Sequence, residues 1–146
     1  MNLVMLEKVT GAIVLDKDSF RIGSQLRRDH FLASRLAETA KLLVKNEPWC
    51  SYLLKPEYIN GMPFLISLFF HNQTLQRVEL VDAHDYNENE NPWSNWSEEK
   101  ENNRKVRHDK WLESILGRPP YRHEWGKISS LYDPRSGGSS IIITYN

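Results

Sequence analysis

The sequence predicts an α+β domain, an antiparallel sheet of five to seven strands packed by one long C-terminal-half helix and one or two short helices. Residues 64–70 form an apolar run of strand length, and a short polar turn leads into the alternating run 75–81. Such a pair predicts an antiparallel hairpin. Residues 97–116 combine leading acids, later bases and apolar residues at helical spacing, which predicts the long helix. Residues 125–132 and 139–145 flank a turn rich in Pro and Gly and predict a second hairpin.

The amino-terminal half has a less regular pattern. Residues 3–15 predict one strand or two short strands broken near Gly11, and Ser24 can cap a short helix that reaches about residue 34. Residues 37–44 fit either a continuation of that helix or a strand, and Pro48 ends a helix in either case. Residues 49–54 predict a strand. Because residues 64–70 are apolar on both faces, we expect that strand in the middle of a sheet covered on both sides.

The long helix carries start and stop signals at its two ends. Ser97 precedes three acids of the first turn, which the helix dipole favours, and Gly117 can end the helix at its carboxyl end. His108 and Trp111 share the apolar face of this helix. We expect both to pack against the sheet together with Trp125, so that they serve folding more than binding.

Composition places the chain among globular proteins, with 40% apolar and 26% charged residues over a length that suits a single domain, 1–146. Cys50 is the only cysteine, the amino terminus lacks a signal-peptide layout, and nowhere do about 18 apolar residues follow one another. These features predict a cytoplasmic protein with no membrane span. A net charge of zero, without a basic patch interleaved with aromatic residues, argues against a nucleic-acid partner.

No catalytic, metal-binding or cofactor motif occurs in the sequence: HExxH, CxxC and phosphate-loop patterns are all absent. Three of the five histidines directly precede an acid, but sequence neighbours do not face each other on a helix or strand. We therefore expect a non-enzyme that uses neither a metal nor a cofactor. One enzymatic alternative stays open, a small hydrolase that uses His84 or His108 with carboxylates brought close by the fold.

Acidic residues gather in one stretch. Residues 79–101 hold eight acids against Lys100 as the single base, and two tryptophans lie among them. Such a stretch predicts a surface for a cationic protein partner with aromatic anchors. The other interpretation is a solvated loop followed by a helix start that favours acids. The predicted partner-binding residues are Asp82, Asp85, Glu88, Glu90, Trp93, Trp96 and Glu98.

A wider pattern spans most of the chain beyond Gly23. It comprises Arg27, Phe31-Leu32, Ser34, Gly61, Phe64, Trp93, Trp96-Ser97-Glu98-Glu99, Glu101, Lys105, His108-Asp109, Trp111-Leu112, Leu116-Gly117, Trp125-Gly126, Ser130, Tyr132-Asp133, Gly137 and Tyr145. In these residues the chain resembles small bacterial immunity proteins, which are encoded beside polymorphic toxins such as those of contact-dependent growth inhibition.

The resemblance implies a cytoplasmic protein that neutralises a cognate toxin by occluding its active site, with no catalytic residues of its own. Many such toxins are nucleases with basic clefts, so it also implies a cationic toxin domain as the partner. A structural or regulatory domain, homodimeric through the exposed face of the sheet, remains the alternative. The sequence leaves open whether the chain is a monomer or a homodimer.

Overall fold

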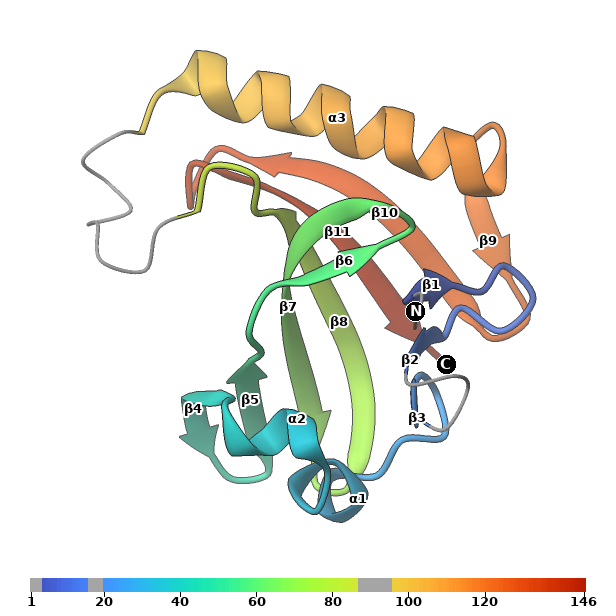
Figure 1. Ribbon diagram of the computed structural model, residues 1–146, viewed down its shortest axis with the longest axis vertical. Helices are drawn as coiled ribbons and strands as arrows, with labels where there is room; N and C mark the ends of the chain where they lie inside the picture. The colour runs from blue at the N-terminus through green and yellow to red at the C-terminus, as the bar shows by residue number, and fades with distance from the viewer. Residues whose placement is uncertain (1–3, 16–19, 87–95) are drawn as a thin grey trace.

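The computed structural model describes residues 4–15, 20–86 and 96–146, and in these ranges it is an α+β fold (Figure 1). Its helices are α1 (Arg28–Leu32), α2 (Arg35–Glu38) and the long α3 (Glu98–Leu116). The strands are β1 (Met5–Leu6), β2 (Ile13–Leu15), β3 (Phe20–Ile22), β4 (Lys41–Asn46), β5 (Trp49–Leu53), β6 (Glu57–Ile59), β7 (Met62–His71), β8 (Thr74–Asp82), β9 (Tyr121–His123), β10 (Gly126–Asp133) and β11 (Gly138–Tyr145).

The strands of the described ranges form two sheets. The main sheet has the order β4-β5-β7-β8-β11-β10-β9, and β6 joins it by pairing with β7. A separate small sheet has the order β1-β2-β3. All these strand pairs are antiparallel, so the predicted class, the hairpins β7–β8 and β10–β11 and the single long helix are confirmed. The strands that the sequence did not reveal, β3, β6 and β9, have three residues each, too few to show a period.

One face of the main sheet carries the core. Alternate residues of β7 are fully buried there, and Phe64 meets Trp111 of α3 with ring centroids 4.6 Å apart. Phe31 of α1 stacks on Phe70 at the other end of the same strand, 5.9 Å away. The small sheet covers the third region, where the Tyr145 hydroxyl donates a hydrogen bond to the Gly11 carbonyl (2.8 Å). Three separate elements therefore close over a single face.

The opposite face is only half-buried, which corrects the expectation that β7 is covered on both sides. The residues of β7 on this face, among them Leu65 and Phe69, have intermediate exposure. Phe69 is shielded by a side chain of the neighbouring strand, since the Arg77 guanidinium lies 4.3 Å from its ring centroid. Apolar residues on this face are thus covered by long neighbouring side chains and not by a second layer, as one-sided antiparallel sheets allow.

The ambiguous segment 37–44 divides between a helix and a strand. The short helix α2 ends at Glu38, and β4 begins at Lys41. The strand pairs with β5 along one side and ends the sheet on the other, with a register irregularity at Leu43. All residues of β4 are exposed, so no buried face gives this segment a periodic apolar pattern. Without such a pattern, the sequence alone could not distinguish a helix from a strand here.

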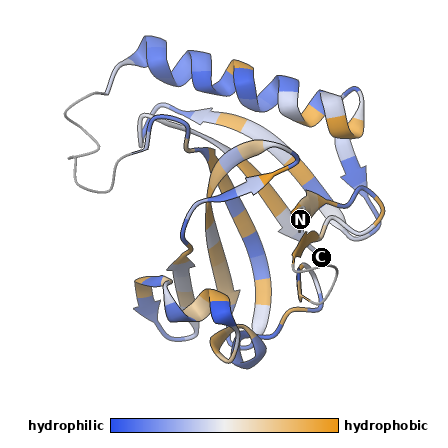
Figure 2. Ribbon diagram, viewed as in Figure 1, coloured by the Kyte–Doolittle hydropathy of each residue, from blue (hydrophilic) through white to orange (hydrophobic). Residues whose placement is uncertain are grey.

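Helix α3 begins and ends at the predicted signals. The Ser97 hydroxyl accepts a hydrogen bond from the Lys100 amide (3.1 Å), and Gly117 ends the helix with φ of +82°. Figure 2 shows a helix that is hydrophilic over most of its length, with apolar residues gathered toward its carboxyl end. In that half Trp111 donates its indole N–H to the Ile59 carbonyl (3.1 Å). Trp125 packs against the Tyr145 ring from β11, which confirms the folding role expected for both tryptophans.

None of the helices within the described ranges is both long and apolar enough to cross a membrane.

Replacing Phe64 by Ala tests the one-sided core. Phe64 is fully buried between the sheet and α3, so the cavity should lower the free energy of unfolding by about 3–5 kcal/mol. The matched variant Phe69→Ala, on the half-exposed face of the same strand, should lose about 1 kcal/mol. Urea unfolding of both variants measures the difference. Equal losses would show that the second face is also buried, against this description.

Candidate protein-binding site

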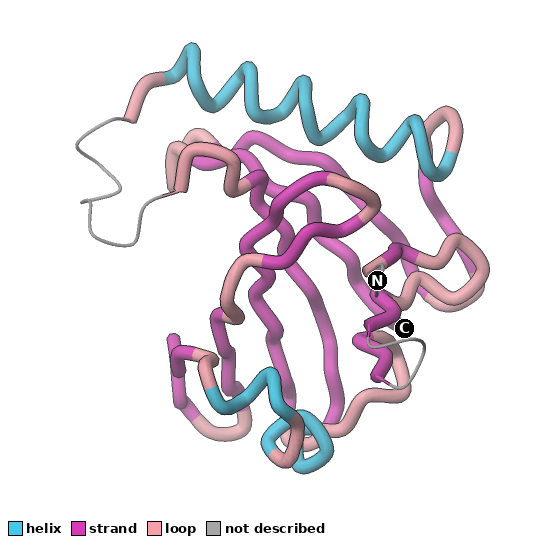
Figure 3. Tube along the Cα trace, viewed as in Figure 1, coloured by secondary structure: helices cyan, strands magenta, loops and turns pink. Residues whose placement is uncertain are grey.

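The described residues among those predicted to bind a partner gather where three segments meet: the end of β8, the start of α3 and the tip of the β10–β11 hairpin (Figure 3). Asp82, Asp85, Trp96 and Glu98 lie here. Glu88, Glu90 and Trp93 lie outside the described residues. The burial and contacts of the described residues at this end therefore show which part of the predicted surface is accessible to a partner.

Glu101 attaches the first turns of α3 to the hairpin. Its side chain is buried, and Oε1 accepts a hydrogen bond from the Ser139 amide (2.9 Å). The Ser139 hydroxyl donates in return to the Glu101 backbone carbonyl (2.7 Å), and Arg104 pairs with the other carboxylate oxygen. A buried carboxylate with all these partners is satisfied, so its burial fixes the position of the helix without leaving an unpaired charge.

Asp82 is a structural residue and not part of a binding surface, which corrects the sequence prediction for this position. It is only 2% exposed, and its Oδ2 accepts from Arg107 Nε (2.5 Å) while Oδ1 accepts from the His84 amide (2.9 Å). Burial alone would raise the pKa of Asp82, but these hydrogen bonds and the Arg107 charge outweigh it and hold the pKa below its usual value. A carboxylate used in this way offers no charge to a partner.

His108 of α3 contacts the backbone of Asp82. It is fully buried against Phe64, and its Nε2 accepts a hydrogen bond from the Asp82 amide (3.0 Å), so the neutral ring carries its proton on Nδ1. Burial lowers the pKa of His108 to about 4, helped by the nearby Arg104 and Arg107 charges and opposed by Asp82. The expectation of a hydrogen-bonded packing histidine is confirmed.

Asp85 is half-exposed but not free. Its Oδ1 accepts from Arg104 Nη2 at 2.9 Å, and the same guanidinium also pairs with Glu101. Counted along the sequence, this stretch has a large excess of negative charge. In the folded protein, arginines of the second and third turns of α3 pair with its acids. The local negative charge is therefore smaller than the sequence count suggested.

Trp96 is the most distinctive exposed residue of this end. Its indole N–H donates to the Gly137 carbonyl at the hairpin tip (2.7 Å), while 44% of the residue stays exposed. Gly137 has φ of +72°, and a Cβ there would come within 3.0 Å of the indole nitrogen. Glycine therefore suits that position. The hairpin tip leaves room for the indole ring and also accepts its hydrogen bond.

Three further residues complete the surface. Glu98 and Glu99 are exposed on the first turn of α3, and Tyr86, which sequence reasoning did not single out, is 43% exposed after Asp85. We call the set Asp85, Tyr86, Trp96, Glu98 and Glu99 the acidic–aromatic surface. The signal for Tyr86 was available, since aromatic residues are enriched at protein interfaces.

A histidine–carboxylate pair also lies at this end. His84 is half-exposed, and its Nδ1 lies 2.9 Å from Asp82 Oδ1. The buried carboxylate therefore orients the ring and leaves Nε2 as the lone-pair nitrogen, which is the arrangement that a general base needs. Among the described residues, no group of three His, Cys, Asp or Glu side chains lies close enough together to hold a metal ion.

Comparisons of the chain with protein-family models, with curated proteins and with solved structures gave no match. The resemblance to immunity proteins therefore stays a prediction from the sequence.

The buried His108 predicts a pH dependence of stability. In the unfolded chain it takes up a proton near pH 6.5, whereas the folded protein resists protonation until about pH 4. The unfolded state thus binds more protons between these values, and stability should fall by roughly 3 kcal/mol as the pH drops from 7 to 4.

His108→Gln supplies the control, because its side-chain oxygen can still accept from the Asp82 amide but does not titrate. Urea unfolding at intervals from pH 7 to 4.5 should give a flatter profile for His108→Gln than for the unmodified chain. Parallel profiles would show that His108 is not held neutral by burial.

Proposed function

We propose that this chain is a non-catalytic, cytoplasmic protein-binding domain, an immunity protein that neutralises a cognate bacterial toxin by covering a cationic active site. The observation that carries the proposal is the exposed Trp96, fixed on the hairpin tip beside the exposed acids Glu98 and Glu99. The resemblance described from the sequence supplies the class of partner.

The state of Trp96 suits an anchor residue. A large aromatic side chain that is already held in one position loses little conformational entropy when a partner covers it. Trp96 is held at one edge by Gly137, so its remaining surface is presented in a fixed orientation. Interface energy concentrates in such aromatic anchors, and the exposed Tyr86 would add a second aromatic ring.

The charges would act mainly on the rate of association. Glu98 and Glu99 project from the first turn of α3, where acids also suit the helix dipole, so they stabilise the helix whether or not a partner is bound. Against a basic cleft the same two charges would favour encounter and orient the approach. Asp82 makes no such contribution because it is buried and paired with Arg107.

Under this proposal, a large secreted protein with a toxic carboxyl-terminal domain should be encoded beside this gene, and the test uses that domain. The unmodified chain should bind it and inhibit its activity. The triple variant Trp96→Ala, Glu98→Lys, Glu99→Lys should bind at least about a hundredfold more weakly, since loss of an anchor alone is typically 2 kcal/mol or more. Binding by surface-plasmon resonance at low and high salt separates the contribution of the charges from that of the ring.

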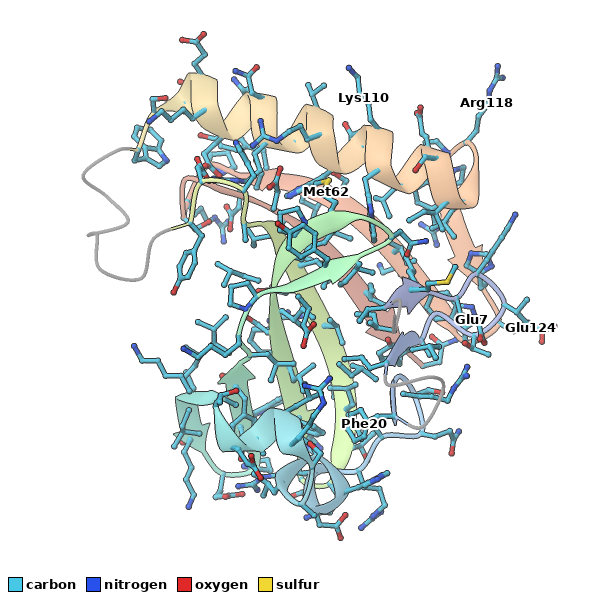
Figure 4. The ribbon with its side chains drawn as sticks, viewed as in Figure 1. Glu7, Phe20, Met62, Lys110, Arg118 and Glu124 are labelled. Carbon is cyan, nitrogen blue, oxygen red and sulfur yellow. The ribbon has the colours of Figure 1, made fainter. Side chains whose placement is uncertain are left out.

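Glu113→Lys is the matched control, because Glu113 is exposed on the same helix near its opposite end. Figure 4 shows Lys110 of α3 and Arg118, just after the helix, pointing away from the sheet. The control should bind as the unmodified chain does. Equal binding by the triple variant, or no binding by the unmodified chain, would contradict the proposal.

The His84–Asp82 pair favours a second candidate function, general-base hydrolysis. If His84 acts as the base, the protein should hydrolyse p-nitrophenyl acetate, and His84→Gln should abolish that activity. His30→Gln, which changes another exposed histidine, is the control. A rate that is the same in both variants would assign hydrolysis to nonspecific surface imidazole and remove this candidate.

A further inference from the structure

A cavity of about 570 Å³ opens between the small sheet and the turn that joins β9 to β10. Figure 1 shows these elements together at the end of the molecule that lies away from the start of α3. The volume falls within the range of about 300–1,000 Å³ that is typical of small-molecule sites in proteins. The acidic–aromatic surface shares no residue with the lining of this cavity.

The inner lining of the cavity is apolar. Leu26 and Ala12, each 4% exposed, line it together with the ring of Trp125. Gly23 lies beside Ala12, and a Cβ added to this glycine would come within 3.0 Å of the Ala12 Cβ. Two of the smallest residues therefore meet here, and protein side chains leave this space open next to the indole ring.

Trp125 is held in place as an aromatic wall. Its ring lies against the backbone of Gly11, where an added Cβ would be only 2.4 Å from Cη2 of the indole. The His123 ring stacks on it almost in parallel, with centroids 5.0 Å apart, and the Tyr145 ring lies 5.8 Å away. A ring fixed in this way loses little conformational entropy when a ligand packs against it.

The charged side chains that line the cavity do not provide a buried partner for an ion. Arg21 pairs with Glu7 at 2.6 Å and donates a second hydrogen bond to the Thr10 hydroxyl (3.2 Å). Glu124 is exposed at the rim, where water and salt screen its charge. The described lining therefore favours an uncharged ligand over an anion or a cation.

We propose that this cavity binds a small uncharged aromatic molecule, with its ring against Trp125 and its polar group toward the rim. Aromatic rings in contact gain energy beyond the burial of their surface, which favours a ring over an aliphatic chain. At the rim, the exposed Ser24, Gln25 and His30 supply hydrogen-bond donors and acceptors. The inference goes beyond the proposed function, because a ligand here would leave the acidic–aromatic surface uncovered.

Indole is the probe, added to the full 15N-labelled chain and followed by two-dimensional NMR. A fragment of this size should bind with a dissociation constant of about 1 mM. Saturable shifts should appear at the amides of Gly11 and Gly23 and at the indole N–H of Trp125, while the indole N–H of Trp96 stays in place. No saturable shift at the first three groups, or equal shifts at Trp96, would overturn the proposal.

Two charged relatives of the probe test the class of ligand. Indole-3-acetate and tryptamine carry the same ring with a negative or a positive group, and neither should bind more tightly than indole. A gain of about tenfold for tryptamine would point to an ion pair with Glu124, and the same gain for indole-3-acetate to an ion pair with Arg21. Either gain would overturn the assignment of an uncharged ligand.

Ala12→Leu fills the cavity from its inner side and should abolish the shifts. Ala37→Leu, the same change on α2 away from the cavity, is the matched control and should bind indole as the unmodified chain does. The NMR spectrum of each variant shows directly whether it is folded.

Val9→Asp is a second variant that spares the fold, because Val9 lines the mouth of the cavity and is 83% exposed. It should weaken indole binding by about threefold or more, since an apolar contact is replaced by a hydrated charge. Val106→Asp on α3 is its control, with Val106 48% exposed. Unchanged binding in both Ala12→Leu and Val9→Asp would place the indole elsewhere and overturn the proposal.

Discussion

The arrangement of the molecule depends on buried polar groups that attach the first half of α3 to the sheet. This half of the helix is too hydrophilic to be held by apolar packing, which gathers toward the carboxyl end around Trp111. Instead Glu101 bonds the β10–β11 hairpin through Ser139, and His108 accepts from the Asp82 amide at the end of β8. Because an unpaired buried carboxylate is costly, the bonds of Glu101 favour one position of the helix along the sheet.

The same attachments determine what is presented to solvent. Asp82 and Glu101 are turned inward and paired with arginines of α3, which removes them from the surface and leaves Glu98 and Glu99 as exposed charges. The hairpin that Glu101 holds is also the one whose tip holds Trp96. The proposed binding surface is therefore positioned by the buried residues beside it that hold the fold together.

Sequence reasoning succeeded where a pattern was long. The period of residues 64–81, the caps of α3 and the turn between β10 and β11 each extend over enough residues to be decisive, so the α+β class and both long hairpins followed from them. It failed for β3, β6 and β9, which are too short to have a period, and for the second face of β7. On that second face of β7, long side chains of neighbouring strands cover the apolar residues in place of a second layer. Which side chain covers which residue depends on the strand register, which the sequence does not show.

The site was predicted in part for the same reason. An acidic run and two tryptophans are visible in the sequence, but the partners of the acids are not, because Arg107 lies 25 positions from Asp82 and reaches it only once α3 has docked. Charge counting therefore placed Asp82 on the surface. The hydrogen bond between Trp96 and Gly137, 41 positions apart, is hidden in the same way, although the sequence does predict Gly137 as a turn residue.

Native-state hydrogen exchange of Glu101→Ala tests the central claim most directly, because that substitution removes the acceptor of the Ser139 amide and the partner of Arg104. If Glu101 holds α3 on the hairpin, the amides of the first helical turns and of the β10–β11 tip should exchange faster, by at least about tenfold, while those shared by β7 and β8 keep their protection. Unchanged exchange at the hairpin tip, or a uniform rise throughout the chain, would contradict the account.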